Sequence, residues 1–485
     1  MIENISRISV ENKLYIGGEW INAISNKTFE VLNPATGELI REIAYGVAED
    51  AKSATDAATE AFESWAETTA DQRNELLMKW FNLVKQNKEE IAKLLTLEQG
   101  KSISEAHGEV NYAASYISWY AEECKRVYGE TIPASSINKR IIVLKQPIGV
   151  VAAITPWNFP AAMFTRKVAT AVAAGCTIVV KPAEATPLTA IKLTELAHEA
   201  GIPKGVINLV TGDPKTIGES WLKDQRIKKL TFTGSTAVGK YLMRESADTV
   251  KKLSLELGGH APFIIFEDAD IDLAVEEVLN SKFRNSGQTC ICANRIYVQK
   301  NVLEEFKTKF VAKTKKIKVG IGTEPGVDIG PLINENGFNK VQDQVEDAIS
   351  KGAIIETGGQ RLIDFKNGYF FEPTILSGVT EEMKISYEET FGPVAPIFEF
   401  ESVEEVIAKA NNSEYGLAAY AFTKNLNLAI KISEKLEYGI VGINDGLPST
   451  AQAPFGGIKN SGLGREGGHH GLDEFLEHKY ISIKI

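Results

Sequence analysis

Residues 147–184 read PIGVVAAITPWNFPAAMFTRKVATAVAAGCTIVVKPAE, and this stretch decides the fold. The β-branched run Ile148–Ile154 is typical of a buried strand, and so is Cys176–Val180. Between them, the apolar segment Met163–Ala174 is long enough to favour a helix. A strand, a helix and a second strand in this order predict a crossover between parallel neighbours of one sheet.

The same alternation continues toward the carboxyl terminus. A helix is expected over Leu188–Ala200, with Thr186-Pro187 supplying its N-cap and first-turn proline. Strands are predicted at three further places, which are Val206–Val210, Lys229–Thr233 and Lys252–Glu256. The pattern therefore predicts an α/β fold built on a doubly wound parallel sheet.

A second α/β unit is expected from Pro262 onward. Its predicted elements are a strand at Pro262–Phe266, helices at Ile271–Phe283, Leu303–Thr314 and Asn334–Lys351, and strands near Pro393–Phe400 and Leu417–Thr423. The amphipathic stretch Ala48–Glu123 is expected to be helical and to pad a sheet. Arg140–Lys145 and Tyr480–Ile485 are isolated strand-like segments, and another subunit can pair with such strands, so we expect a homo-oligomer.

The bulk composition disfavours several classes of partner. The 53 basic and 64 acidic residues give a formal net charge of −11, which argues against nucleic acid and anionic membranes as partners. Four cysteines are too few for a disulfide framework, and no metal site is predicted. Met1–Gly17 lacks the apolar core of a signal peptide, and no apolar stretch is typical of a transmembrane helix, so we expect a cytoplasmic protein.

Two glycine-rich stretches match phosphate-binding patterns only in part. Gly462-Leu-Gly-Arg-Glu-Gly467 fits a dinucleotide fingerprint but follows no clear strand, so we interpret it as a surface loop. Gly234-Ser-Thr-Ala-Val-Gly-Lys240 is close to a P-loop, but Tyr241 replaces the hydroxyl residue that would hold magnesium. What remains is a strand followed by a helix that begins near Ser235, where free amides suit a phosphate or pyrophosphate; a plain strand-to-helix turn is the alternative.

A second signal for a cofactor is Lys181-Pro-Ala-Glu184, at the carboxyl end of a predicted strand. Ligands of open α/β sheets bind at that edge, and a Lys and a Glu can hydrogen-bond ribose hydroxyls. A carboxylate would repel a 2′-phosphate, so Glu184 favours NAD over NADP. An exposed charge pair is the alternative interpretation.

Three further residues are candidates for chemistry. Cys290 lies in a short turn marked by Gly287, where access and nearby amides can stabilise a thiolate; a buried structural cysteine is the alternative. Glu256 ends an apolar strand, so partial burial should raise its pKa toward that of a general base, unless it caps a helix. Asn158 lies between Pro156 and Pro160 and can be a fixed oxyanion donor or an ordinary turn residue.

Taken together, the chain closely resembles the aldehyde dehydrogenase superfamily over essentially its whole length. The motifs that carry the resemblance occur in order over about 300 residues, which makes the set far more specific than any single motif. They are the Pro156–Pro160 loop, Lys181 to Glu184, Phe232-Thr-Gly-Ser235, Glu256-Leu-Gly-Gly259, Gly287-Gln-Thr-Cys290, Glu389-Thr-Phe-Gly-Pro393 and Pro454-Phe-Gly-Gly457.

The resemblance implies a fold of three parts. These are an NAD(P)-binding domain at residues 1–124 and 148–257, a catalytic domain at 258–460, and a small β arm at 125–147 and 472–485. In the family, the arm builds dimers and often tetramers.

The resemblance also implies a role for individual residues. Cys290 is implied to be the nucleophile, Asn158 with the Cys290 backbone N–H the oxyanion hole, Glu256 the base that activates the deacylating water, and Lys167 a proton relay. The implied cofactor contacts are Pro156, Trp157, Lys181, Glu184, Gly234, Ser235, Glu389 and Phe391. An aldehyde would thereby become a carboxylate through a thiohemiacetal and a thioester on Cys290, with NAD preferred and NADP possible.

The segment around Cys290 resembles succinate-semialdehyde dehydrogenases in particular. Arg166, Arg284 and Ser449 match the residues that hold the substrate carboxylate in those enzymes, and paired guanidinium groups suit a carboxylate. Pro448 and Thr450 depart from the pattern around that serine, so glutarate or 2-oxoglutarate semialdehyde is an alternative substrate.

Other interpretations stay open. Cys292, two residues after Cys290, resembles a redox-switch partner, with a silent spare thiol as the alternative. A protein with this fold that binds without turnover is a rival, as fold does not fix function. A dehydrogenase that transfers the acyl group to CoA is another, although Glu256 favours water.

Overall fold

The computed structural model describes residues 10–365 and 367–485. Residues 1–9 lie outside this range, and they belong to the segment Met1–Gly17, which was predicted not to be a signal peptide. None of the helices in the described part is long and apolar enough to cross a membrane.

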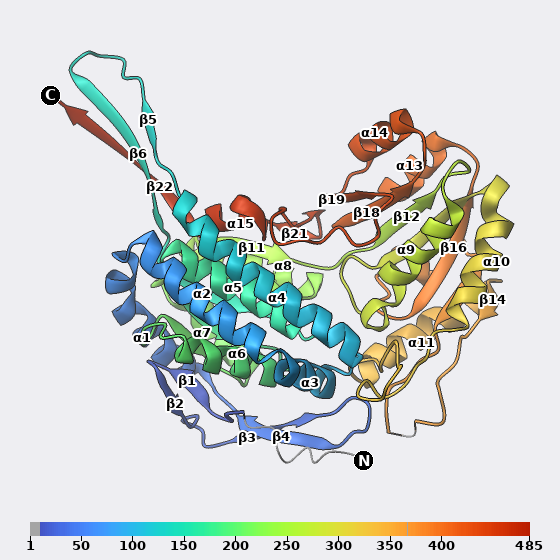
Figure 1. Cartoon of the computed structure of the whole chain (residues 1–485), viewed down its shortest axis with the longest axis horizontal. Coiled ribbons are helices and arrows are strands. Elements are labelled where there is room, and N and C mark those ends of the chain that lie inside the picture. The colour runs from blue at the N-terminus through green and yellow to red at the C-terminus, as the bar shows by residue number, and fades with distance from the viewer. Residues whose placement is uncertain (1–9, 366) are drawn as a thin grey trace.

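The amino-terminal half is built on an eight-stranded sheet whose strand order is β2-β1-β9-β8-β7-β10-β11-β21 (Figure 1). The five strands from β9 to β11 run parallel, which confirms the predicted doubly wound sheet. Two strands that the sequence did not reveal extend the sheet: β1 pairs antiparallel with β9, and β2 pairs antiparallel with β1. The bounds are β1 Leu14–Ile16, β2 Glu19–Ile21, β7 Val150–Ile154, β8 Thr177–Lys181, β9 Ile207–Leu209, β10 Ile227–Thr233, β11 Lys252–Glu256 and β21 Gly462–Leu463.

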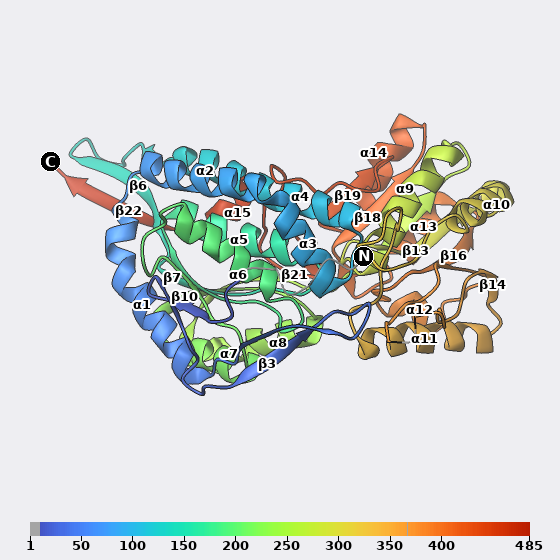
Figure 2. The same ribbon diagram turned by 60° about the horizontal axis from the view of Figure 1, so that its bottom comes forward.

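Helices cover both faces of this sheet, and Figure 2 shows the two layers edge on. One core cluster joins α2 to α6 with the sheet, and another joins α1, α7 and α8 with its opposite face. The predicted helical stretch 48–123 forms four helices. The bounds are α1 Ala48–Ala66, α2 Ala70–Gln86, α3 Lys88–Gln99, α4 Ile103–Glu123, α5 Pro160–Ala174, α6 Leu188–Glu199, α7 Pro214–Lys223 and α8 Thr236–Glu245.

The second α/β unit contains a seven-stranded sheet in the order β14-β15-β16-β13-β12-β18-β19, parallel except for β14. Helices α9 and α10 pack on one face, and α11 to α14 lie on the other. The strands are β12 Ala261–Ile265, β13 Ala293–Gln299, β14 Ile354–Thr357, β15 Thr374–Ser377, β16 Val394–Phe400, β18 Ala418–Phe422 and β19 Ile440–Ile443. The helices are α9 Ile271–Phe283, α10 Leu303–Thr314, α11 Glu335–Ser350, α12 Lys384–Tyr387, α13 Val403–Asn411 and α14 Leu426–Lys435.

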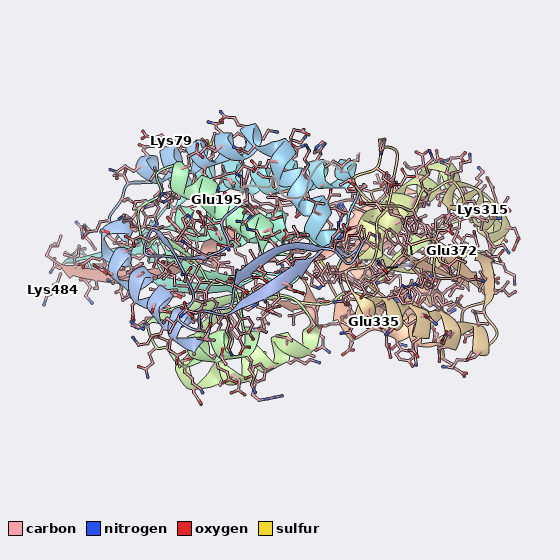
Figure 3. All side chains as sticks on the ribbon, turned by 90° about the horizontal axis from the view of Figure 1, so that it is seen from below. Lys79, Glu195, Lys315, Glu335, Glu372 and Lys484 are labelled. Carbon is pink, nitrogen blue, oxygen red and sulfur yellow. The ribbon has the colours of Figure 1, made fainter. Side chains whose placement is uncertain are left out.

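Smaller elements complete the chain. They are the hairpin of β3 Thr28–Leu32 and β4 Leu39–Ala44, the pair β17 Tyr415–Gly416 and β20 Ile458–Lys459, and the short helix α15 Gly468–Asp473. Charged side chains such as Lys79, Lys315 and Glu335 lie on the outside of the molecule (Figure 3).

A three-stranded sheet projects from the body and carries the carboxyl terminus (Figure 1). It consists of β5 Glu130–Ile132, β6 Lys139–Pro147 and β22 Leu476–Lys484. Arg140–Lys145 and Tyr480–Ile485 were expected to be isolated strands. This expectation is wrong, because β22 pairs antiparallel with β6 over nine residues of the same chain. Oligomerisation therefore no longer follows from unpaired strands, and it stays a prediction.

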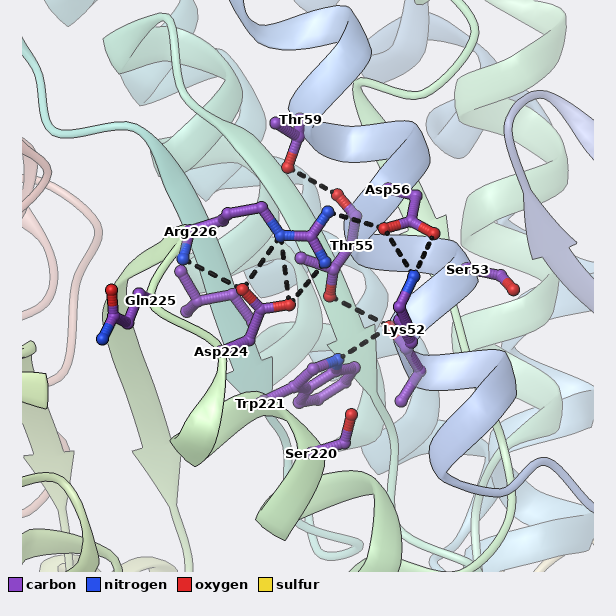
Figure 4. Close-up of polar contacts among 12 residues, drawn as sticks. Lys52, Ser53, Thr55, Asp56, Thr59, Ser220, Trp221, Asp224, Gln225 and Arg226 are labelled. Atoms are coloured by element: carbon purple, nitrogen blue, oxygen red, sulfur yellow. Dashed lines mark hydrogen bonds and ion pairs between the residues drawn. The ribbon is translucent and has the colours of Figure 1, made fainter.

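A cluster of hydrogen bonds and ion pairs joins helix α1 to residues 221–226, which precede β10 (Figure 4). Arg226 donates to Asp224 and, through Nη1, to Asp56 on α1 at 2.6 Å. The buried indole of Trp221 donates to the Ala51 carbonyl at 3.3 Å. The turn before β10 and helix α7 therefore each make a hydrogen bond to α1.

The amino terminus of α6 is not capped as predicted. Pro187 occupies the N-cap position and Thr186 makes no capping bond. Instead, Glu98 from the end of α3 accepts hydrogen bonds from the backbone N–H groups of Leu188 at 2.7 Å and Thr189 at 2.9 Å. The buried Glu98 side chain therefore joins the N-terminal helices to the sheet domain.

Glu98→Ala should leave these two buried N–H groups without an acceptor. We expect the free energy of unfolding to fall by about 1–3 kcal/mol, measured as a lower urea midpoint. Glu60→Ala, at an exposed position of α1, is the control and should shift the midpoint far less. Equal midpoints for the two variants would contradict the capping role.

Candidate active site

A cavity of about 480 Å³ is lined by residues from both α/β units. Segments that follow β7, β10 and β11 form one side, and the segments around Cys290 and Glu389 form the other. Eleven of the predicted site residues line it: Pro156, Trp157, Asn158, Arg166, Gly234, Ser235, Arg284, Cys290, Glu389, Phe391 and Ser449. Glu256, Lys167, Lys181, Glu184 and Cys292 are not among its lining residues.

Cys290 is the one partly exposed thiol, because the other three cysteines in the described residues are buried. Helix α9 ends in a distorted turn in which Asn285 and Ser286 have φ values of 52° and 57°. A side chain at Gly259 would overlap the Cys290 carbonyl, so the glycine lets two backbone segments meet here. The sequence places the thiol correctly at an accessible turn.

The protonation state of Cys290 differs from the expectation. Burial raises the pKa of the Cys290 thiol to about 12, and the nearby guanidinium of Arg166 offsets only part of this effect. Burial therefore opposes the ionised form of the thiol that was expected here. Because only the thiolate is a strong nucleophile, Cys290 needs a proton acceptor to react.

Asn158 is held at both its side chain and its backbone. Its Nδ2 donates to the Gln288 carbonyl at 2.9 Å. Its own carbonyl accepts from Asn285 Nδ2 at 2.9 Å and from Lys101 Nζ at 3.0 Å. One amide hydrogen of Asn158 thus ties it to the segment that carries Cys290, and the second hydrogen remains available as a donor.

Glu256 ends β11 in a fully enclosed position. Neither of its carboxylate oxygens has a hydrogen-bond partner within the described residues, so it does not cap a helix. Burial raises the pKa of Glu256 well above its usual range, and Glu466 adds to the rise. A Cβ at Gly456 would lie 2.8 Å from Glu256 Oε1, so this carboxylate occupies space that only a glycine leaves open.

Glu466 is a residue of the site that the sequence did not reveal. Its Oε2 lies 2.9 Å from Arg166 Nε, and its Oε1 accepts from Lys167 Nζ. Burial lowers the pKa of Lys167, which also donates to Thr231 Oγ1 at 3.2 Å. Two adjacent cations inside an apolar helix signal a buried acid, but the sequence alone does not say which one.

The interpretation of residues 462–467 as a surface loop is wrong. Strand β21 pairs antiparallel with β11, with Gly462 opposite Glu256 and Leu463 opposite Leu255. The same stretch places the buried Glu466 in contact with Arg166 and Lys167 of α5. The glycines permit this close packing, since a side chain at Gly462 would overlap the Leu255 carbonyl.

Some residues that line the cavity carry hydrogen-bond donors without acceptors. Arg166 Nη2, Arg284 Nε and Ser449 Oγ are buried and have no partner within the described residues. The Arg166 guanidinium lies 4.1 Å from the centroid of the Phe455 ring, and Arg284 lies 5.3 Å from that of Phe159. Unmatched cationic donors beside aromatic walls suit an anionic group attached to a short carbon chain.

The cavity lining also includes six of the residues predicted to contact a cofactor, which are Pro156, Trp157, Gly234, Ser235, Glu389 and Phe391. Ser235 is the N-cap of α8, and Glu389 Oε1 accepts from the Gly259 N–H at 2.8 Å. Phe391 adopts a strained φ of 55°, and its ring packs edge-to-face with Trp157 at 5.5 Å. A planar aromatic wall next to a helix amino terminus fits a nucleotide with a heteroaromatic ring.

The remaining predicted residues lie outside the cavity. Lys181 and Glu184 pair with each other at the end of β8. Cys292 is buried, and its thiol lies 3.6 Å from the Lys282 carbonyl. Its role as a redox switch stays a prediction. The described residues contain no group of three or more His, Cys, Asp or Glu side chains that could bind a metal.

The raised pKa of Cys290 predicts how its alkylation depends on pH. The rate with iodoacetamide should rise about tenfold per pH unit from pH 7 to 10, because the thiolate fraction rises until the pH reaches the pKa. Peptide mass spectrometry should find the label on Cys290, and Cys290→Ser should abolish this pH-dependent labelling. A rate that levels off near pH 7 would contradict the raised pKa.

Comparisons with known proteins agree with this geometry. The chain is 51% identical over 474 residues to the 3-sulfolactaldehyde dehydrogenase of Pseudomonas putida. The aligned region covers 98% of this chain and 97% of that protein. The chain is 52% identical over 471 residues to the glutarate-semialdehyde dehydrogenase of the same species, covering 97% of each chain. The crystal structure of succinate-semialdehyde dehydrogenase from Burkholderia pseudomallei is similar with a TM-score of 0.97 and 53% identity, covering 98% of each chain. The model of the aldehyde dehydrogenase family matches residues 20–481, so this chain belongs to the aldehyde dehydrogenase family.

Proposed function

We propose that this chain oxidises a short aldehyde with an anionic group at its far end, with succinate semialdehyde as the first candidate, to the carboxylate with NAD(P)⁺. The observation that carries the proposal is that Cys290 lines the same cavity as Arg166, Arg284 and Ser449. The names of similar proteins support this substrate class, since succinate, glutarate and sulfolactate aldehydes all carry a second, anionic end. Glutarate and 2-oxoglutarate semialdehyde are the alternative substrates.

Chemistry would begin at Cys290. The Cys290 thiol would first give its proton to Glu256, which acts electrostatically on this thiol and would release the proton to solvent before hydrolysis. The sulfur then attacks the aldehyde carbon, and the developing oxyanion accepts hydrogen bonds from Asn158 Nδ2 and the Cys290 N–H. A preorganised donor of this kind stabilises such a transition state by about 3–4 kcal/mol. Loss of a hydride from the resulting thiohemiacetal leaves a thioester on the sulfur.

Glu256 would then accept the proton of the water that hydrolyses the thioester. A base is competent only when ionised, and the pKa of Glu256 is raised by burial. The hydrolysis step should therefore become faster as the pH rises through that pKa. Lys167, paired with Glu466 behind Glu256 and Arg166, is proposed to help relay this proton.

The predicted cofactor contacts in the cavity lining suit NAD(P). Gly234 and Ser235 would hold the pyrophosphate at the amino terminus of α8, and Glu389 and Phe391 the nicotinamide ribose and ring, beside Pro156 and Trp157. The bound cofactor supplies the hydride acceptor. Lys181 and Glu184 would contact the adenosine ribose, and the carboxylate of Glu184 favours NAD over NADP.

The chain is further proposed to consist of a cofactor domain at 1–124 and 148–257, a catalytic domain at 258–460 and an arm at 125–147 and 472–485. The projecting sheet of β5, β6 and β22 supports the arm assignment. We propose that this arm joins subunits of a homo-oligomer.

A substrate panel tests the function directly. The purified chain is mixed with succinate, glutarate and 2-oxoglutarate semialdehydes and with 3-sulfolactaldehyde, each with NAD or NADP, and absorbance at 340 nm is followed. We expect the highest kcat/KM with a member of this panel, without added CoA. No turnover with any of them would favour a protein that binds without catalysis, and turnover only with CoA would favour acyl transfer to CoA.

Arg284 is the sharper probe of the anion site, because Arg166 also pairs with Glu466. Arg284→Ala should raise KM for succinate semialdehyde about 10- to 100-fold, as a charged hydrogen bond contributes about 1.5–3 kcal/mol. Butanal has the same chain length but no carboxylate, so its KM should change less than about threefold. Equal changes for the two aldehydes would refute the anion site.

Glu184→Gln should shift the cofactor preference. Removal of the negative charge should raise the ratio of kcat/KM with NADP to that with NAD about 5- to 10-fold, because the repulsion of a 2′-phosphate is relieved. Glu199→Gln, exposed at the end of α6, is the control. An unchanged ratio in Glu184→Gln would contradict the assignment of Glu184 as a contact of the adenosine ribose.

A further inference from the structure

The ammonium of a buried lysine outside the cavity hydrogen-bonds one acid and the segment that carries Asn158. Lys101 follows α3, and its side chain is 1% exposed. Its ammonium donates to Glu109 Oε2 and to the Asn158 carbonyl at 3.0 Å, and it lies 4.0 Å from the centroid of the Phe159 ring. Two of its three N–H donors are thus used in hydrogen bonds, and the charge also lies against the Phe159 ring.

Glu109, on α4, continues the same connection. Its Oε1 accepts hydrogen bonds from the N–H groups of Ala161 at 2.8 Å and Ala162 at 3.3 Å, in the first turn of α5. Lys101 and Glu109 therefore hold residues 158–162 from both ends. The pair fixes where β7 passes into α5, which is the turn that positions the Asn158 amide.

A buried ion pair is costly, since each charge loses its hydration, and apolar residues of similar size often stabilise a fold equally well. Stability is thus a weak reason for this pair. Its remaining contacts are specific, because they go to the peptide groups and the ring next to Asn158. The Asn158 carbonyl is shared with Asn285 Nδ2, and the backbone N–H of Asn285 donates to Glu105 Oε1 at 2.6 Å.

We propose that Lys101 is a positioning residue that acts through Asn158: with Glu109, it holds the Asn158 amide where the oxyanion of the reacting aldehyde forms. The inference rests on the proposed function, which makes Asn158 an oxyanion donor. Lys101 is not among the lining residues of the cavity, so its loss should disturb the reaction more than the binding of substrate or cofactor.

The first test is a set of variants at Lys101. A displacement of a catalytic group by about 1 Å can cost up to 100-fold in rate, so Lys101→Met should lower kcat about 10- to 100-fold. KM for the aldehyde and for the cofactor should change less than about threefold. Lys101→Arg keeps the charge and should recover part of the lost kcat.

A double-mutant cycle tests whether Lys101 acts through Asn158. Asn158→Ala removes the donor, so adding Lys101→Met to it should lower kcat by less than about twofold more. A full additional loss of 10-fold or more would show that Lys101 acts elsewhere and would overturn the inference. If Asn158→Ala itself keeps its kcat, the proposed oxyanion hole fails, which is a different result from an unaffected Lys101→Met.

Lys229→Met is the matched control for stability. Lys229 is as deeply buried as Lys101, and its ammonium lies 3.4 Å from Glu474 Oε2 and donates to Ser254. Both variants should lower the thermal midpoint, but only Lys101→Met should lower kcat. If kcat stays unchanged in Lys101→Met, the pair is structural only. If Lys101→Met does not fold, Glu109→Gln takes its place, and an unchanged kcat there overturns the inference.

Discussion

Two neighbouring cations inside an apolar helix constrain the rest of this structure. Every residue of α5 from Pro160 to Ala174 is buried, and Arg166 and Lys167 are among them. Charges in such a place need a charged partner, and Glu466 provides it for both. Glu466 comes from the far end of the chain, so the demand of α5 for an acid helps to bring β21 and the carboxyl-terminal segment against the first sheet.

The same three charges set the electrostatics of the reactive groups. Burial raises the pKa of Glu256, and the charge of Glu466 raises it further, while Arg166 and Lys167 lower it. Arg166 also lowers the pKa of Cys290, although burial dominates there. Arg166 therefore acts on both Cys290 and Glu256, the proposed nucleophile and base, and a change at Arg166 should alter the pKa of each.

Local patterns in the sequence predicted the elements well and their long-range contacts poorly. Strand β11 at Lys252–Glu256 and helix α9 at Ile271–Phe283 have the predicted bounds, since their apolar periodicity is a local property. The partner of Lys167 is 299 residues away in the sequence. The residue that caps α6 is likewise supplied by another helix, so neither could be deduced from the neighbouring residues. Cys290, Asn158 and the arginines were found because short motifs carry them.

The two arginines of the proposed anion site are not equivalent. Arg166 shares its charge with Glu466 and lies against the rings of Tyr116 and Phe455, so its guanidinium is held in place but partly neutralised. Arg284 forms no ion pair within the described residues, and its Nε lacks a partner. Arg166 is thus suited to fix the direction of an anionic group, and Arg284 to supply most of the attraction. Because the chain as a whole is negative, this local positive charge must overcome the general repulsion of an anionic aldehyde.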